Sequence, residues 1–195
     1  DFYGSPLDLD LDEEVFVGRL SVDKGTDLTL QLDKIIAYQT APVLLGHYDR
    51  ALLVAHEEGA PGKYQGAHES VRTASYSNPP DFLTRYGDAN ATNADVLDDI
   101  DDGVGLVCYR GHGSTFTWSD WNNANQDFHK NQVLELTNKV LPVVWSIACT
   151  NHNLATDGGG PVDCIGEAWL EVEHGAVASY AATRTTFTTP NHELD

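Results

Sequence analysis

The sequence has 195 residues, 41% hydrophobic and 21% charged, a composition typical of one compact globular domain rather than a disordered or fibrous segment. Its 30 Asp and Glu residues against 11 Lys and Arg leave a net charge of −19, which would repel phosphate backbones and anionic lipid surfaces. No apolar run approaches the roughly 20 residues that a membrane-spanning helix requires. We therefore expect neither a nucleic-acid partner nor a membrane span. The lack of Met suggests excision from a longer precursor.

The first predicted elements are a strand and a helix. An apolar run that follows an acidic segment predicts a strand around Val15 to Val17. A stripe of apolar residues at helical spacing predicts a helix over residues 26–39, capped by Thr26 or Asp23. The stripe comprises Leu28, Leu32, Ile35 and Ile36.

The acidic segment at the start of the chain has two interpretations. Asp8, Asp10 and Asp12 alternate with leucine, and their carboxylates are ligands that calcium prefers. The glycine and the distal Glu of a calcium loop are missing, which favours a solvated edge. No metal site is assigned from the sequence.

Alternating buried strands and helices occupy the rest of the chain. Residues 50–55 (RALLVA) predict a buried strand, residues 59–81 predict a surface excursion with a short helix at 68–74, and Asn93 begins another helix. Further apolar runs predict strands at 103–109, 141–148 and 175–180, with helices at 132–136 and 166–173. This alternation predicts an α/β fold, a three-layer α/β/α sandwich around a mostly parallel sheet.

A histidine and a cysteine each follow a buried strand of this sheet. His112 comes after the strand that ends at Tyr109, and Cys149 after the strand that ends at Ile147. Chemistry in parallel sheets gathers past the carboxyl ends of the strands, so the two loops should face one another. An imidazole beside a thiol can take its proton and produce the nucleophilic thiolate. The alternative is a loop histidine that satisfies a hydrogen bond and a buried, unreactive cysteine.

The cysteines are odd in number, so at least one thiol stays free. Cys108 lies in a predicted buried strand and Cys164 opens a predicted helix, so both are interpreted as structural. The four tryptophans are interpreted as core or pocket wall.

Four segments resemble one family when taken in order: VGRLSV (17–22), GVGLVCYRGHGS (103–114), LPVVWSIACTN (141–151) and CIGEAWL (164–170). They resemble the gingipain family of cysteine peptidases, relatives of caspases and legumain, and the similarity runs from about Glu14 to Pro190. The resemblance implies a caspase-like fold and a catalytic dyad of His112 and Cys149. Gly113 matches the glycine whose amide helps to form the oxyanion hole of the family.

The resemblance also implies roles for other residues. Glu58, in the HEEG segment, would hydrogen-bond the catalytic histidine, although a solvated loop glutamate is the alternative. The segment TRTTFTTP (183–190), which includes Thr185, resembles the wall of the primary specificity pocket. Phe187 would be the aromatic residue of that wall, or else a core phenylalanine.

Specificity is where the chain departs from the family. Arginine-specific gingipains place an Asp in the loop after the Glu, whereas the matching stretch here is YQGAHES (64–70). If Glu69 occupies that position, a basic residue at the cleavage site is expected; if Gln65 does, basic specificity is in doubt. Arg184, near the expected pocket, would favour an acidic side chain, or else it is a surface arginine.

The resemblance predicts a single caspase-like catalytic domain over residues 1–195 that lacks the N-terminal subdomain of the family. The predicted activity is that of a cysteine endopeptidase with an acyl-enzyme intermediate. A sortase-like transpeptidase and a catalytically silent calcium-binding module are the alternatives. Catalysis needs no cofactor, and structural calcium is allowed. Expected partners are a protein or peptide substrate and an inhibitory propeptide or the missing subdomain, and the expected location is secreted or at the cell surface.

Overall fold

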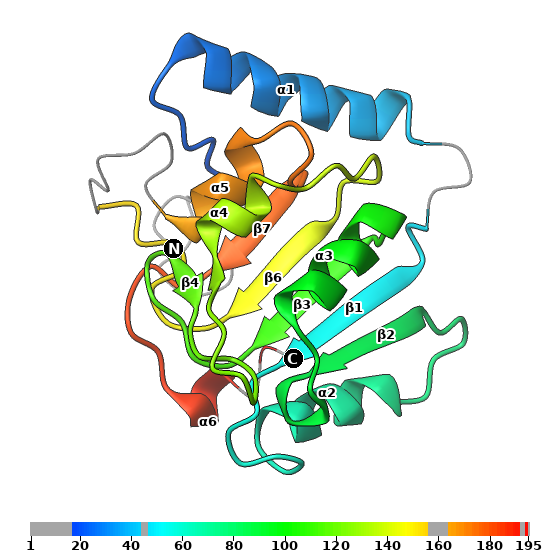
Figure 1. Ribbon diagram of the computed structural model, residues 1–195. Coiled ribbons are helices and arrows are strands. Elements are labelled where there is room, and N and C mark those ends of the chain that lie inside the picture. Colours follow the sequence, from blue (N-terminus) through cyan, green and yellow to red (C-terminus); the bar gives the residue numbers. More distant parts are fainter. Residues whose placement is uncertain (1–16, 44–46, 156–163, 192–193, 195) are drawn as a thin grey trace, which may run out of the picture.

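The computed structural model describes residues 17–43, 47–155, 164–191 and 194, and it is built around a five-stranded sheet of order β2-β1-β3-β6-β7 (Figure 1). The strands are β1 (Arg50–Ala55), β2 (Asp81–Tyr86), β3 (Leu106–Arg110), β6 (Val143–Ile147) and β7 (Ala178–Ala181). All neighbouring strands in this sheet run parallel. The predicted mostly parallel sheet is therefore confirmed.

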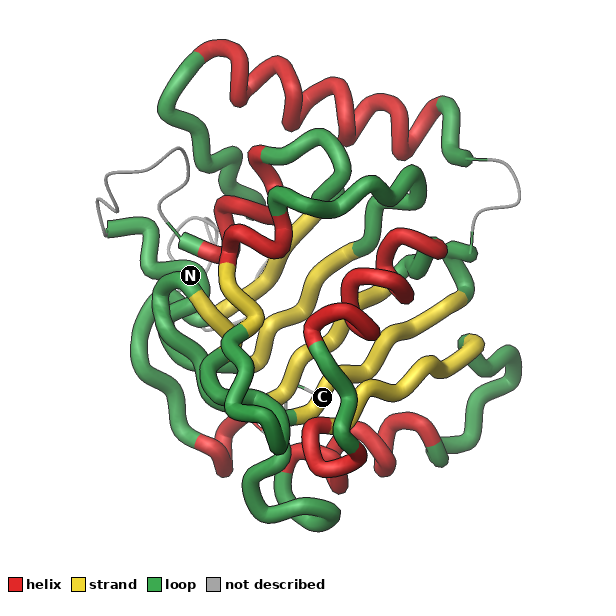
Figure 2. Tube along the Cα trace, in the orientation of Figure 1, coloured by secondary structure: helices red, strands yellow, loops and turns green. Residues whose placement is uncertain are grey.

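Helices flank the sheet, and a small ribbon lies beside its carboxyl edge. The helices of the described residues are α1 (Gly25–Thr40), α2 (Tyr64–Arg72), the short 3-10 helix η1 (Gly87–Ala89), α3 (Asn93–Asp102), α4 (Lys130–Val133), α5 (Ile165–Glu171) and α6 (Thr188–Asn191). The ribbon pairs β4 (Thr117–Trp118) with β5 (Phe128–His129) in antiparallel fashion. Figure 2 shows loops gathered where the strands end, on the side toward which the arrows of β3 and β6 point in Figure 1.

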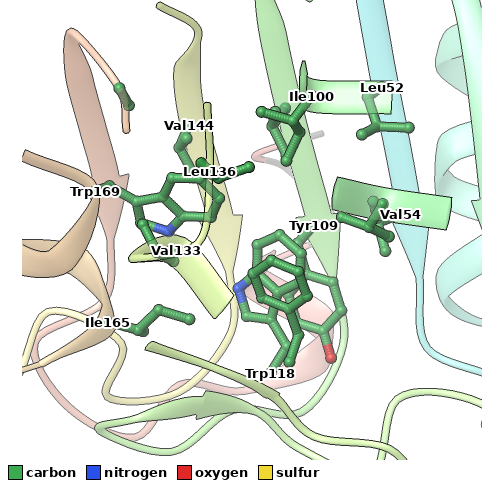
Figure 3. Close-up of a cluster of buried hydrophobic side chains, with 14 of the residues drawn as sticks. Leu52, Val54, Ile100, Tyr109, Trp118, Val133, Leu136, Val144, Ile165 and Trp169 are labelled. Atoms are coloured by element: carbon green, nitrogen blue, oxygen red, sulfur yellow. The ribbon is translucent and has the colours of Figure 1, made fainter. Parts of the chain in front are cut away.

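Alternate residues along each strand enter opposite layers of the molecule. On one face, strand residues such as Leu52 and Val144 pack with side chains of α3, α4 and α5, as Figure 3 shows. On the other face, Leu53 and Ile147 pack with Tyr64, the first residue of α2. Because strands buried on both faces need apolar residues at consecutive positions, the sequence shows them as continuous apolar runs. The three-layer α/β/α arrangement is confirmed.

Stacked aromatic rings form much of the core near the carboxyl edge. Trp118 of the ribbon stacks on Tyr109 of β3 at 4.4 Å between ring centroids and on Phe128 at 4.6 Å. Trp118, Trp121 and Trp169 are each at most 1% exposed, as expected for core residues. The Tyr109 hydroxyl donates to the carbonyl of His112 at 2.8 Å, so this packed layer fixes the loop that carries His112.

The predicted N-terminal helix is confirmed as α1, but its cap and its buried side chains differ from expectation. Its N-cap is Lys24, whose amide donates to the Asp27 carboxylate at 3.1 Å. The side chains that α1 buries are Gln31 and Lys34, and the Lys34 ammonium donates to carbonyls at the end of α5 at 2.8 to 3.3 Å. The apolar stripe is consequently part-exposed: Leu28 37%, Leu32 40% and Ile36 56%.

The structure differs from expectation in the helix of the excursion predicted for residues 59–81 and in a strand directly after it that was not predicted. The helix begins earlier, at Tyr64, and it buries His68, whose Nε2 lies 3.0 Å from the carbonyl oxygen of Val54. Residues 81–86 then form β2, the edge strand beside β1. The strand was missed because it is mostly only part-buried and follows two prolines, so its sequence shows no continuous apolar run.

Two further expectations concern the acidic N-terminal segment and a membrane span. Asp8, Asp10, Asp12 and most of the strand predicted at Val15 to Val17 lie outside the described residues. Among the described residues, no helix has the length and apolar character to cross a membrane.

Candidate active site

Three neighbouring strands bring the candidate catalytic residues to one edge of the sheet. In the parallel register, Ala55 of β1 pairs with Arg110 of β3, which in turn pairs with Ile147 of β6. Glu58 lies three residues beyond Ala55, and His112 and Cys149 lie two residues beyond their paired positions. Because the carboxyl ends of parallel strands share an edge, all three residues reach the same side of the molecule.

Gly113 allows the loop of His112 to pack directly on the turn of Cys149. A Cβ at position 113 would lie 2.8 Å from the Cβ of Ala148, 2.8 Å from Nδ2 of Asn151 and 2.9 Å from the carbonyl oxygen of Cys149. Only a glycine fits at that separation. The amides of Gly113 and Cys149 donate no hydrogen bond to another residue in the described parts of the chain, so both stay available to a ligand.

The side chain of Asn151 connects the loops of His112 and Cys149 through hydrogen bonds. This side chain is fully buried, its Nδ2 donates to the carbonyl of Thr117 at 3.0 Å and also to that of Ser114, and its Oδ1 accepts from the Ser146 hydroxyl at 2.6 Å. A buried amide with all these partners is costly to displace. The relative position of the His112 and Cys149 loops is therefore fixed by the fold.

The turn that carries Cys149 is strained and braced by a distant segment. Thr150 has a φ of 56°, a left-handed conformation that a β-branched residue rarely adopts. Its amide donates to the carbonyl of Arg184 at 3.1 Å. In the same segment, the amide of Thr186 donates to Sγ of Cys149 at 3.4 Å. An N–H group aimed at the sulfur is suited to solvating a thiolate.

His112 is held by Glu58, as the resemblance implied. Nε2 of His112 lies 2.7 Å from Oε2 of Glu58, and the Lys63 ammonium contacts the same oxygen. The hydrogen bond from Lys63, reinforced by that from His112, lowers the pKa of Glu58 to about 2 against the opposing effect of desolvation. Glu58 is therefore ionised at neutral pH.

This contact decides which nitrogen of His112 is free. A carboxylate only accepts hydrogen bonds, so Nε2 of a neutral His112 carries the proton and Nδ1 carries the lone pair. Within the described residues Nδ1 has no hydrogen-bond partner. The imidazole side chain is 52% exposed, which leaves it reachable by a substrate.

His56, Tyr64 and Lys63 also surround His112, and the sequence analysis did not single them out. His56 and Tyr64 each place a ring edge-on to the imidazole of His112, with centroids 4.9 and 5.7 Å away. Burial, followed by the charge of His112, lowers the pKa of His56 to about 4, so His56 is neutral and its Nδ1 accepts from the amide of Glu58 at 2.9 Å. The position of His56 directly after a buried strand was the available signal.

The two candidates for the base of a specificity pocket have partners elsewhere. Glu69 forms a bidentate ion pair with Arg72 and accepts from the Tyr86 hydroxyl at 2.7 Å. The amide group of Gln65 lies beside the carboxylate of Asp88, to which it can donate at 3.0 Å. Within the described residues, neither side chain forms a hydrogen bond or an ion pair with Cys149 or His112.

The segment expected to wall the specificity pocket does lie beside Cys149. Phe187 is 72% exposed, which rules out the alternative that it is a core residue. Thr186, missed by the sequence analysis, makes the contact with the cysteine sulfur. Arg184 and Thr185 line a cleft of about 720 Å³ next to the turn of Cys149. Nothing in the sequence could distinguish Thr186 from the threonines around it.

The other two cysteines differ from Cys149 in their burial. Cys108 and Cys164 form no disulfide and are buried, and burial raises the pKa of Cys164 to about 12, whereas Cys149 is only part-buried. In the described ranges, no group of three or more His, Cys, Asp or Glu side chains is arranged to hold a metal ion. Of the three thiols, Cys149 alone combines solvent access with a neighbouring imidazole loop.

Comparisons with known proteins agree on one family. The family model described as peptidase family C25 matches residues 1–195. Gingipain R2 of Porphyromonas gingivalis is 30% identical over 199 residues, which cover 93% of this chain and 25% of that protein. The chain therefore spans about a quarter of the length of this curated relative.

Two solved structures share the fold. The crystal structure of the Arg-specific cysteine proteinase gingipain R matches with a TM-score of 0.74 and 26% identity, over 97% of this chain and 45% of that one. The complex of Porphyromonas gingivalis RgpB pro- and mature domains matches with a TM-score of 0.73 and 26% identity, over 97% of this chain and 46% of that one.

Proposed function

This chain belongs to peptidase family C25, and on that premise we propose that it is a cysteine endopeptidase in which Cys149 and His112 form the catalytic dyad. The observation that carries the proposal is the close packing at Gly113, which places the His112 loop against the carbonyl of Cys149. A cysteine that merely fills the core would need neither the facing imidazole loop nor the strained turn at Thr150.

The first half of the reaction forms an acyl-enzyme. Nδ1 of His112 takes the proton of the Cys149 thiol, and the thiolate attacks the peptide carbonyl carbon, so that a C–S bond forms and the carbonyl π electrons move to oxygen. The free amides of Gly113 and Cys149 would donate to this oxyanion, and each such donor contributes roughly 10²- to 10³-fold in rate. When the tetrahedral intermediate collapses, the C–N bond breaks and His112 gives its proton to the departing amine.

The second half releases the product. A water molecule gives a proton to His112 and attacks the thioester carbon, the C–S bond breaks, and a carboxylic acid leaves while the thiol is restored. Glu58 stabilises the imidazolium that forms in both halves, because its own carboxylate remains ionised. The imidazole and thiol supply the nucleophile and the proton transfers, so the chemistry requires no cofactor. Any calcium would have a structural role.

Two alternatives share the fold. In a transpeptidase, an amine in place of water would attack the thioester, and the same dyad would serve. A catalytically silent calcium-binding module would keep the fold without the chemistry. Within the described ranges, no group accepts from the amides of Gly113 and Cys149, which favours an enzyme over a silent module, since unsatisfied donors at a site of this kind are suited to a developing oxyanion.

Partners and location are part of the same proposal. We propose a protein or peptide substrate, and an inhibitory propeptide because the solved relative is a complex of pro- and mature domains. We also propose that the protein acts secreted or at the cell surface, where salt screens the repulsion of a chain with a net charge of −19. Cell fractionation would test the location.

Alkylation tests the dyad directly. Iodoacetamide at neutral pH should label Cys149 first, with the buried Cys108 and Cys164 as internal controls in the same digest. The preference should disappear in His112→Ala. Equal, slow labelling of all three thiols would overturn the enzyme proposal. Incubation of a cleaved peptide with an added amine acceptor, followed by mass spectrometry, then separates hydrolysis from amine transfer.

A further inference from the structure

Two arginines line the cleft beside Cys149, on a chain whose net charge is −19. Arg19, from the N-terminal part of the chain, and Arg184, from the segment after β7, both line it. They belong to a set of only 11 Lys and Arg residues against 30 Asp and Glu. Two of these few cations therefore converge on one cleft from opposite ends of the sequence.

Neither guanidinium is tied to a carboxylate of the described fold. Within residues 17–43, 47–155 and 164–191, no carboxylate forms an ion pair with Arg19 or Arg184. Other arginines of the chain do have such partners: Arg50, Arg72 and Arg85 pair with Asp81, Glu69 and Asp99. Both arginines are exposed and, among the described residues, neither has a carboxylate partner, so both are suited to pair with an anionic ligand.

The other side chains of the cleft suit the same kind of ligand. Its polar lining residues include Asn153, Thr150, Thr183 and Thr185, and no described lining residue is acidic. Hydroxyl and amide groups can donate to a carboxylate alongside a guanidinium, which binds a carboxylate through paired N–H groups. A basic side chain would meet two positive charges there.

The cleft adjoins the nucleophile. Thr150 follows Cys149 directly, and Thr185 precedes Thr186, whose amide contacts Sγ of Cys149. The hydrogen bond from the Thr150 amide to the Arg184 carbonyl holds the two segments side by side. A peptide whose carbonyl carbon reaches Sγ therefore passes beside the cleft.

We propose that this cleft binds an acidic side chain, Asp or Glu, close to the scissile bond of the peptide substrate, with Arg19 and Arg184 as its charged donors. The inference rests on the proposed peptidase function and specifies its substrate class. It also separates this chain from the solved relative described as Arg-specific. The carboxylate of Glu69, which a basic substrate would need, is already neutralised by Arg72.

Matched fluorogenic peptides test the charge preference. Peptides that differ only by Glu or Gln at each position around the cleaved bond should show at least about tenfold higher kcat/KM for Glu at one position. Arg19→Gln and Arg184→Gln should each bring the ratio of kcat/KM for the Glu and Gln peptides most of the way toward one. Arg184→Glu should reverse the preference, so that a Lys peptide becomes better than the Glu peptide. The hydrogen bond from the Thr150 amide to the carbonyl of residue 184 involves only main-chain atoms, so these substitutions do not remove it.

A control and a binding assay complete the test. Lys139→Gln removes the same charge from an exposed position before β6, at the opposite edge of the sheet, and should leave the preference intact. Fluorescence anisotropy with Cys149→Ala should show tighter binding of the Glu peptide than of the Gln peptide. Equal affinities would overturn the inference even if peptides are cleaved. If Cys149 resists alkylation and no peptide is cleaved, the peptidase proposal fails. The affinities of the Glu and Gln peptides measured by anisotropy still show whether the cleft prefers an acidic side chain.

Discussion

Replacing Gly113 with alanine tests the contact on which the candidate site depends. Ordinary van der Waals contact begins at about 3.4 Å, whereas the new Cβ would lie 2.8 Å from Ala148 and Asn151 and 2.9 Å from the Cys149 carbonyl oxygen. The loops would therefore have to separate by about 0.6 Å. Asn151, held by three hydrogen bonds, cannot yield without losing some of them.

The expected consequences are separable into activity and stability. A misplacement approaching 1 Å between reacting groups costs about 10²-fold in rate, so kcat should fall about 30- to 100-fold in Gly113→Ala. The crowding should also cost about 1–3 kcal/mol of unfolding free energy, as overpacked sites do. Gly25→Ala is the matched control, because its Cβ would meet nothing within 4 Å, and α1 should gain up to about 1 kcal/mol.

The assay combines kinetics with unfolding. Initial rates on a cleaved peptide, and the alkylation rate of Cys149, are measured at neutral pH and compared with urea unfolding of the same variants. Activity of Gly113→Ala within threefold of the parent chain would refute the reasoning, because it would mean that the two loops need not be in contact for catalysis. A loss of activity in Gly25→Ala would point instead to a general effect of the substitution.

Four further outcomes are expected. The pKa of Glu58 falls from 4.5 to about 2, so its stabilising contribution is present above pH 4.5 and is lost as the pH falls toward 2. In urea unfolding, Glu58→Gln should reduce this loss of stability at low pH. The effect should be modest, because the carboxylate is half exposed. Burial lowers the pKa of His56 from 6.5 to about 4, so the unfolded chain binds the proton more tightly and stability should fall as the pH drops over that range. His56→Gln should remove that slope, worth at most about 3 kcal/mol, and an unchanged slope would contradict the assignment. Phe187→Ala should leave stability within about 0.5 kcal/mol but raise KM, whereas Phe128→Ala, at a fully buried position, should cost about 3–5 kcal/mol. EDTA should leave kcat unchanged, and a loss that calcium restores would show that a metal supports the site.

Apolar patterning along the chain is enough to place His112 and Cys149 at one edge of the sheet. β1, β3 and β6 are buried on both faces, so they appear as continuous apolar runs, and parallel strands present their carboxyl ends together. His112 and Cys149 could therefore be assigned to one edge of the sheet from the order of these runs. The missed strand β2 lacks this signal, because an edge strand that is part-exposed needs no continuous apolar run.

Glu58 could be assigned from the resemblance, but the other neighbours of the proposed dyad are set by tertiary packing alone. The contacts of His112 with His56 and Tyr64, and of Cys149 with Thr186, join segments far apart in sequence. They depend on β1 and β6 lying on either side of β3, an order that local patterns do not contain. The convergence of Arg19 and Arg184 on one cleft has the same origin, because side-chain proximity between distant segments is set by how the layers pack and not by the spacing of residues along the chain.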